Sequence, residues 1–107
     1  MKVTITSLEL KSISKLIIFI STIKKIDQQL KNTNCIAYKK SGFWKKYYTM
    51  TLWQNEEDMR TFTRSGAHLQ AMKISQSMAK KIETLTFEAN ELPSWKYAKK
   101  VLSEQKI

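Results

Sequence analysis

The sequence predicts an α+β domain whose strands and helices alternate in the order βαββαβ, with the helices on one sheet face and a further helix at the C-terminal end. Two periods along the chain support this order. Residues 2–9 are rich in β-branched side chains and alternate between two faces, as in a strand. Over residues 12–31 apolar side chains recur every three or four positions, as on one face of a helix. We expect one domain over residues 1–107, because this length suffices for a single core.

The first predicted helix carries an apolar stripe. The stripe consists of Ile13, Leu16, Ile17, Ile20, Ile23, Ile26 and Leu30, with Asp27 beside Ile26. Many of these residues are β-branched, which lowers helix propensity. A run of this length is nevertheless too long for a strand, so we assign a helix that ends at Asn32.

Two strands and a second helix are expected next. Residues 35–40 and 46–53 are rich in strand-forming side chains and are joined around Ser41 and Gly42, which favour a turn. Asn55 is a suitable N-cap for a helix. Three acidic residues follow it, and they suit the positive end of the helix dipole.

The C-terminal third contains a strand and a short helix. We expect the second helix to continue to about Lys81, with a break near Gly66, and a fourth strand to occupy residues 82–89. Pro93 suits the first turn of a terminal helix. The apolar side of that helix consists of Trp95, Ala98 and Leu102.

Threonine is frequent on the face of the predicted sheet that is not strongly apolar. The residues are Thr4, Thr6, Thr49, Thr51, Thr84 and Thr86. A solvated sheet face in so lysine-rich a chain should carry lysine. We therefore expect this face to be covered, by the same surface of another subunit. The alternative is that threonine is simply a good strand former.

The chain is basic, with 19 Lys and Arg against 9 Asp and Glu and a formal net charge of +10. Such a charge favours anionic partners, whereas the dispersed lysine pairs are typical of a solvated surface. The βαββαβ order also describes an RNA-recognition domain, and residues 46–53 resemble its aromatic third strand. The required glycine and alternating aromatic residues are missing. A nucleic-acid partner is therefore an alternative, not our first interpretation.

Cys35 is the only cysteine, so an intramolecular disulfide is ruled out and a reducing compartment is expected. One cysteine and one histidine are too few for a typical metal site. The N-terminus lacks the features of a signal peptide. The apolar run over residues 16–20 is far shorter than the roughly 20 residues of a membrane span. We expect a soluble, cytoplasmic protein without a metal site.

Residues 50–72 carry a family resemblance. A strand ends at Trp53, an acidic helix start follows, Phe62 lies in that helix, and residues 65–68 read Ser-Gly-Ala-His. This pattern resembles the antibiotic-biosynthesis-monooxygenase-like group of dimeric α/β barrels, near the relatives of spheroidene monooxygenase. The resemblance implies a ferredoxin-like subunit that pairs sheet to sheet in a homodimer. It also implies a ligand pocket between the sheet and the helices of each subunit.

The haem-degrading members of that group use a Trp and a His on this helix and an Asn on the first strand. Those positions fall on Phe62, Met72 and Ser7. All three depart from the pattern, so the resemblance does not imply haem degradation. We expect no cofactor, although haem binding is left open because Met can ligate haem iron.

His68 is the only histidine, one helical turn before Met72. It can act as a proton acceptor or ligand contact, or it can be a hydrogen-bonded residue at a helix break. We expect a small apolar or aromatic ligand in a pocket lined by Trp53, Phe62 and Met72. The resemblance implies a cofactor-independent monooxygenase-like enzyme with His68 as its catalytic proton acceptor. A non-catalytic binding or regulatory dimer is the alternative.

Overall fold

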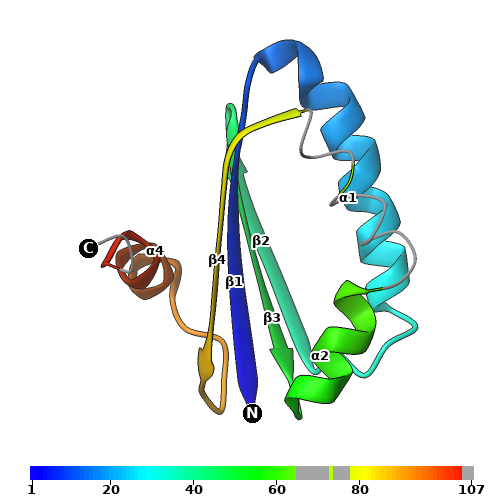
Figure 1. The fold of residues 1–107 in the computed structure, drawn as a ribbon, viewed down its shortest axis with the longest axis vertical. Helices are drawn as coiled ribbons and strands as arrows, with labels where there is room; N and C mark the ends of the chain where they lie inside the picture. Colours follow the sequence, from blue (N-terminus) through cyan, green and yellow to red (C-terminus); the bar gives the residue numbers. More distant parts are fainter. Residues whose placement is uncertain (65–72, 74–77, 105–107) are drawn as a thin grey trace.

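The computed structural model describes residues 1–64, 73 and 78–104. Four strands and three α-helices are described in this part of the chain (Figure 1). In order they are β1 (Lys2–Leu10), α1 (Leu16–Leu30), β2 (Ala37–Phe43), β3 (Lys46–Trp53), α2 (Glu56–Thr63), β4 (Ala79–Glu88) and α4 (Trp95–Glu104). A short 3-10 helix, η1 (Ile13–Lys15), leads into α1.

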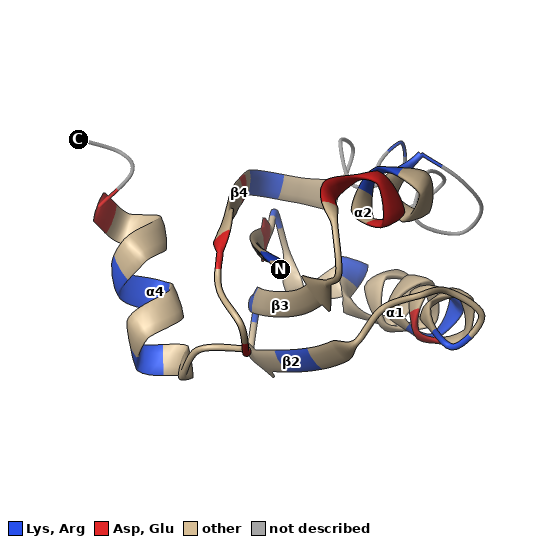
Figure 2. Ribbon diagram, turned by 90° about the horizontal axis from the view of Figure 1, so that it is seen from below, with Lys and Arg blue, Asp and Glu red and all other residues tan. Residues whose placement is uncertain are grey.

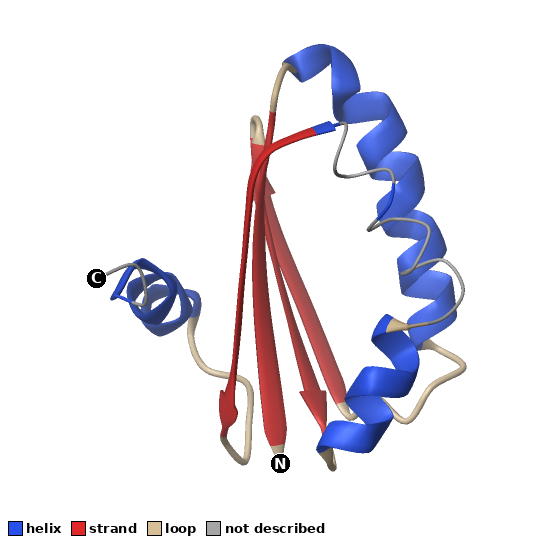
Figure 3. Ribbon diagram, in the orientation of Figure 1, coloured by secondary structure: helices blue, strands red, loops and turns tan. Residues whose placement is uncertain are grey.

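The four strands form one antiparallel sheet with the order β2-β3-β1-β4. Helices α1 and α2 lie on one face of this sheet, and α4 lies on the other (Figures 1 and 3). The predicted α+β class and element order are therefore confirmed. The expectation that all helices share one face is wrong, because α4 packs on the opposite side.

The far face, which α4 covers, contains the largest part of the core. It consists of Val3, Ile5, Met50 and Leu52 from the sheet, and Ala98 and Leu102 from α4. None of these side chains is more than 4% exposed. The Trp95 ring also packs near the Tyr48 ring, with 6.2 Å between centroids. The predicted apolar side of the terminal helix is thus the side that contacts the sheet.

The stripe predicted for α1 is confirmed in part, because Ile23, Ile26 and Leu30 line the cavity, whereas three of its isoleucines are exposed. Ile13, Ile17 and Ile20 are 42%, 82% and 43% exposed, whereas Phe19 is 5% exposed and packs toward the sheet. The cause is the composition of the segment, in which isoleucine occupies both sides of the helix. Periodicity therefore gave the helix and part of its inward side, but did not separate the inward isoleucines from the exposed ones.

The hairpin between β2 and β3 turns at Trp44 and Lys45, later than the predicted turn at Ser41 and Gly42. Trp44 has a φ of 60°, a left-handed backbone conformation that costs energy for a residue with a large side chain. Gly42 lies within β2, opposite Tyr47. A Cβ at Gly42 would collide with the Tyr47 ring, so the glycine serves close packing there.

Helix α2 begins as predicted. The Asn55 side chain accepts a hydrogen bond of 2.9 Å from the backbone N–H of Asp58, which confirms the N-cap. The break predicted near Gly66 falls outside the described residues. The predicted continuation of the helix to Lys81 is wrong, because β4 already begins at Ala79.

Basic residues are dispersed over the molecule. In Figure 2 the blue segments lie on several elements, among them α1, β2 and α4. Several are paired with acids, for example Lys2 with Glu88 at 2.7 Å and Arg60 with Glu56 at 2.8 Å. Among the described residues, none of the helices is long and apolar enough to cross a membrane.

Candidate ligand-binding cavity

A cavity of about 510 Å³ lies between the sheet and helices α1 and α2. Its volume falls within the range of small-molecule sites. The described residues that line it come from all four strands and both helices, and most of its surface is apolar. The principal apolar residues are Leu8, Phe19, Ile23, Ile26, Leu30, Met59, Phe62, Met78 and Ile82.

Threonines form the sheet side of this cavity. The strand register aligns them in two rows of three across β4, β1 and β3: Thr86, Thr4 and Thr51, then Thr84, Thr6 and Thr49. All except Thr86 line the cavity. This face is therefore covered, as the absence of charge predicted. The prediction that a second subunit covers it is wrong, because α1 and α2 of the same chain do so.

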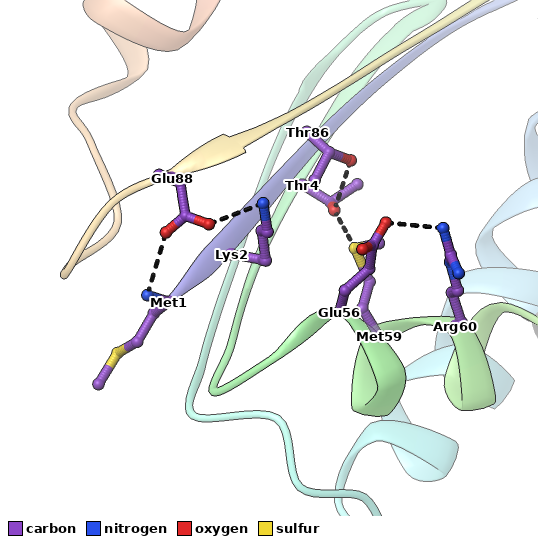
Figure 4. A network of polar contacts seen from close by, with 8 residues as sticks. All are labelled: Met1, Lys2, Thr4, Glu56, Met59, Arg60, Thr86 and Glu88. Carbon is purple, nitrogen blue, oxygen red and sulfur yellow. Dashed lines mark hydrogen bonds and ion pairs between the residues drawn. The ribbon is translucent and has the colours of Figure 1, made fainter.

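One threonine also connects the sheet to α2. The hydroxyl of Thr4 lies 3.0 Å from that of Thr86 and donates to the sulfur of Met59 at 2.7 Å (Figure 4). Beyond this point, Glu88 pairs with Lys2 and the N-terminal amine (Figure 4). The hydrogen bond and charge of Lys2 hold the pKa of the Glu88 carboxyl below its usual value.

An aromatic pair lies at each end of the cavity, with Phe19, Tyr47 and Phe62 in the lining. Phe19 of α1 packs on Tyr47 of β3 with 4.6 Å between ring centroids. Phe62 of α2 packs on Trp53 with 5.3 Å between centroids. These two contacts join α1 and α2 to opposite ends of β3. The cavity lies between the two contacts.

Tyr38 also belongs to this lining, and its hydroxyl is buried beside Asp27. It lies opposite Thr51 in the register and so extends the first threonine row onto β2. Two residues later, Lys40 pairs through Nζ with Oδ2 of Asp27 at 2.5 Å. Burial, and then the neighbouring Asp27 carboxylate, raise the pKa of the Tyr38 hydroxyl well above its usual value.

The structure separates the residues predicted from the family resemblance. Phe62 lines the cavity. Trp53 is fully buried behind it, with Nε1 donating to Oγ1 of Thr51 at 2.8 Å, and it is not part of the described lining. Ser7 is buried and its Cα pairs with Tyr48 and Glu83, away from the cavity lining. His68 and Met72 lie outside the described residues.

Several cavity residues were not anticipated as site residues. Phe19, Tyr38 and Tyr47 are the main examples. Tyr38 and Tyr47 could have been found from strand alternation, because both share the threonine face. Phe19 could have been found from helical spacing, because it lies three residues after Leu16 and four before Ile23 on the inward side of α1.

Within the described residues, the cavity lining contains no carboxylate and no imidazole. In the same part of the chain, no three His, Cys, Asp or Glu side chains are grouped so that they could hold a metal ion. The lining therefore offers shape, apolar contact and hydroxyl groups. Lys73, which is exposed, is the charged residue among the described lining residues.

No protein-family model and no curated protein sequence matches this chain. Solved structures do match it. An antibiotic biosynthesis monooxygenase is 10% identical with a TM-score of 0.75, over 87% of this chain and 100% of its own. SnoaB, a cofactor-independent oxygenase from Streptomyces nogalater, is 11% identical with a TM-score of 0.67, over 87% and 97%. A conserved protein from Methanosarcina mazei is 14% identical with a TM-score of 0.74, over 83% and 92%.

At these identities the matches show the fold. The chain has the ferredoxin-like α+β fold of the antibiotic-biosynthesis-monooxygenase-like proteins, which confirms the structural part of the predicted resemblance. The narrower placement near spheroidene monooxygenase stays a prediction.

Proposed function

We propose that this protein binds one small apolar or aromatic molecule in the cavity between the sheet and helices α1 and α2. The observation that supports this proposal best is the cavity itself, about 510 Å³ with apolar walls and a threonine floor. A cavity of this size and lining would bury most of the surface of a flat ligand with two to four rings. The absence of charged side chains from the threonine rows supports an uncharged ligand body.

We further propose a cofactor-independent monooxygenase-like activity, since one protein of the same fold is described as a cofactor-independent oxygenase. In such a reaction an electron-rich substrate reacts with oxygen itself. The protein excludes water, orients the substrate and accepts a proton. His68 is our candidate for the proton acceptor, and Met72 for an additional lining residue.

Two variants of α1 test the ligand site with a matched control. Ile26→Trp fills the cavity, whereas Ile17→Trp adds the same indole to the exposed side of the same helix. N-phenyl-1-naphthylamine, a neutral fluorophore, should bind the wild type and Ile17→Trp, and should bind Ile26→Trp at least tenfold more weakly. Unchanged binding by Ile26→Trp would show that the cavity is not the site.

The activity is tested with anthrone, whose acidic CH2 group reacts with oxygen after losing a proton. In this reaction CH2 and O2 give a carbonyl and water, so one atom of ¹⁸O2 enters the product. We expect wild-type protein to accelerate ¹⁸O incorporation above the spontaneous rate, and expect Ile26→Trp and His68→Ala to remove the acceleration. Fluorophore binding without acceleration would support the alternative, a non-catalytic binding protein.

We also propose a homodimer, and native mass spectrometry of freshly purified protein tests the subunit number together with any retained ligand. The far sheet face would be the pairing surface only if α4 contributes to it or moves, because α4 covers Met50 and Leu52. Because α4 covers this face of the sheet, an RNA-recognition function is not favoured. Such a function needs an open sheet face on which bases can stack.

A further inference from the structure

The outer side of α1, which faces away from the sheet, is apolar and exposed. Ile13, Ile17, Ile18 and Ile20 are 42%, 82%, 51% and 43% exposed. Three of them, at positions 13, 17 and 20, follow the three- and four-residue spacing of one helix side, along η1 and the first turns of α1. Single exposed apolar residues are common on soluble proteins, whereas a contiguous exposed patch marks a contact with a protein or a membrane.

The same segment is basic. Residues 10–26 contain four lysines and no acidic residue. These lysines are Lys11, Lys15, Lys24 and Lys25. Lys24 continues the isoleucine stripe, four residues after Ile20. Among the described residues, none of the four lysines forms an ion pair, so the positive charge of this segment is not neutralised within that part of the chain.

The combination of bare isoleucines and unpaired lysines identifies the partner by its chemistry. An anionic lipid surface offers negative headgroups to the lysines and hydrocarbon to the isoleucines. A nucleic acid would engage the lysines only, because it is bound through phosphate contacts and stacking on aromatic rings. A second copy of the chain, paired by two-fold symmetry, would bring the same basic segment against itself, and the like charges would repel.

We infer that the outer side of η1 and of the first turns of α1 docks on an anionic membrane surface, with the isoleucines below the lipid headgroups and the lysines among them. The helix lies in the plane of the membrane and does not cross it. This inference goes beyond the proposed function and does not depend on a ligand in the cavity.

Docking on this side would place the cavity next to the membrane. The inner side of the same helix contributes Ile23, Ile26 and Leu30 to the cavity lining. Helix α1 would therefore lie between the cavity and the lipid, in which neutral apolar molecules dissolve better than in water.

Flotation with lipid vesicles tests this surface. We expect the wild type to float with vesicles of phosphatidylcholine that contain one third phosphatidylglycerol, and to stay unbound with vesicles of phosphatidylcholine alone. Added salt should weaken the binding, because it screens the attraction between the lysines and the headgroups.

A matched pair of isoleucine variants tests the apolar contact. Ile17→Gln removes the most exposed of the four isoleucines and should weaken binding to the anionic vesicles about tenfold. Ile36→Gln is the control, because Ile36 is 47% exposed in the loop between α1 and β2. This control should bind like the wild type.

A matched pair of lysine variants tests the charges. Replacing Lys24 and Lys25 together by Gln should weaken binding about tenfold or more, since each lysine near an anionic surface contributes to attraction. Replacing Lys96 and Lys100 together by Gln removes the same charge from exposed positions of α4, which lies on the other face of the sheet (Figure 3). The α4 variant should bind like the wild type.

Three results would overturn the inference. The first is a wild type that does not bind the anionic vesicles. The second is an equal loss of binding in the two lysine variants, because binding would then follow net charge and not the surface of α1. The third is unchanged binding by Ile17→Gln, because the isoleucines would then stay outside the lipid.

Sedimentation velocity without vesicles distinguishes the membrane from a second copy. We expect Ile17→Gln to sediment like the wild type at every protein concentration. A wild-type dimer that Ile17→Gln dissociates would make this side of α1 a subunit interface, and would overturn the membrane assignment.

Discussion

Gly42 shows how a single missing side chain shapes the cavity. It pairs with Tyr47 across the hairpin, and a Cβ at this position would collide with the Tyr47 ring. We predict that Gly42→Ala displaces the ring from Phe19 and from the cavity wall, at a cost of about 1–3 kcal/mol in the free energy of unfolding. Urea unfolding measures this cost. Fluorophore binding should weaken in the same variant.

The matched control for Gly42→Ala is Ser41→Ala. Ser41 is the preceding residue of β2, and it pairs with Tyr48, not with Tyr47. This substitution should change stability by less than about 0.5 kcal/mol, as is usual away from packed contacts. Equal effects of the two substitutions would show that Tyr47 is not held against Gly42.

Cys35 gives a second prediction, on reactivity. Its thiol donates to the carbonyl oxygens of Ala37 and Leu52 at 3.2 and 3.7 Å. Burial raises the pKa of the thiol, so the thiolate fraction at pH 8 is smaller than for a free cysteine. Because the thiolate is the nucleophile, we predict alkylation by iodoacetamide roughly threefold slower or more in the folded chain than in urea. Mass spectrometry of timed samples measures both rates, and equal rates would contradict the raised pKa.

Among the elements, those with sharp local signals were predictable from the sequence. Strand β3 has its predicted bounds, and the Asn55 cap is where the acidic turn indicated. The inward side of α1 was predicted only in part, because isoleucine on both sides weakens the contrast on which an amphipathic pattern depends. The hairpin turn was misplaced for another reason. Gly42 indicated a turn in the sequence. In the structure the glycine is required for another reason, because the Tyr47 ring packs where its Cβ would lie.

The orientation of α1 makes a prediction of its own. Phe19 packs against Leu10, Met78 and Tyr47, whereas Ile17 is 82% exposed. Phe19→Ala should lower the free energy of unfolding by about 3 kcal/mol, the range for a buried aromatic residue. Ile17→Ala should change it by less than about 0.5 kcal/mol. Both values come from urea unfolding. Similar costs would mean that Ile17 packs against the rest of the protein, as the predicted stripe had it.

For the site, the sequence indicated a region and its chemistry, but not its geometry. Phe62 came from the family resemblance and lies in the cavity wall, whereas Trp53 is packed behind it. The place of Tyr38 beside the threonine rows and Asp27 depends on strand register and on a residue from another element. Such a convergence of distant residues has no local signature, so periodicity and caps could not reveal it.

At the scale of the whole molecule, the two sheet faces have different roles. The threonine face borders the cavity, and the opposite face, with Val3, Ile5, Met50 and Leu52, forms a close-packed core with α4. The threonine rows that lack charge thus border the cavity under α1 and α2, not a second subunit. Any pairing of subunits through the sheet depends on the far face and therefore on α4.

This dependence on α4 can be tested at Leu102, which is 4% exposed on the side of α4 that contacts the sheet. Leu102→Asp buries a carboxylate there or detaches the helix, and should lower the free energy of unfolding by about 3 kcal/mol or more. A detached α4 would uncover a contiguous apolar face, and such faces associate. We therefore predict a concentration-dependent increase in sedimentation coefficient for Leu102→Asp.

Ser103→Asp places the same charge on the exposed side of α4 and should sediment like the wild type. Identical sedimentation and stability of both variants would mean that α4 does not cover the sheet in solution, and that the far face is already occupied by a partner.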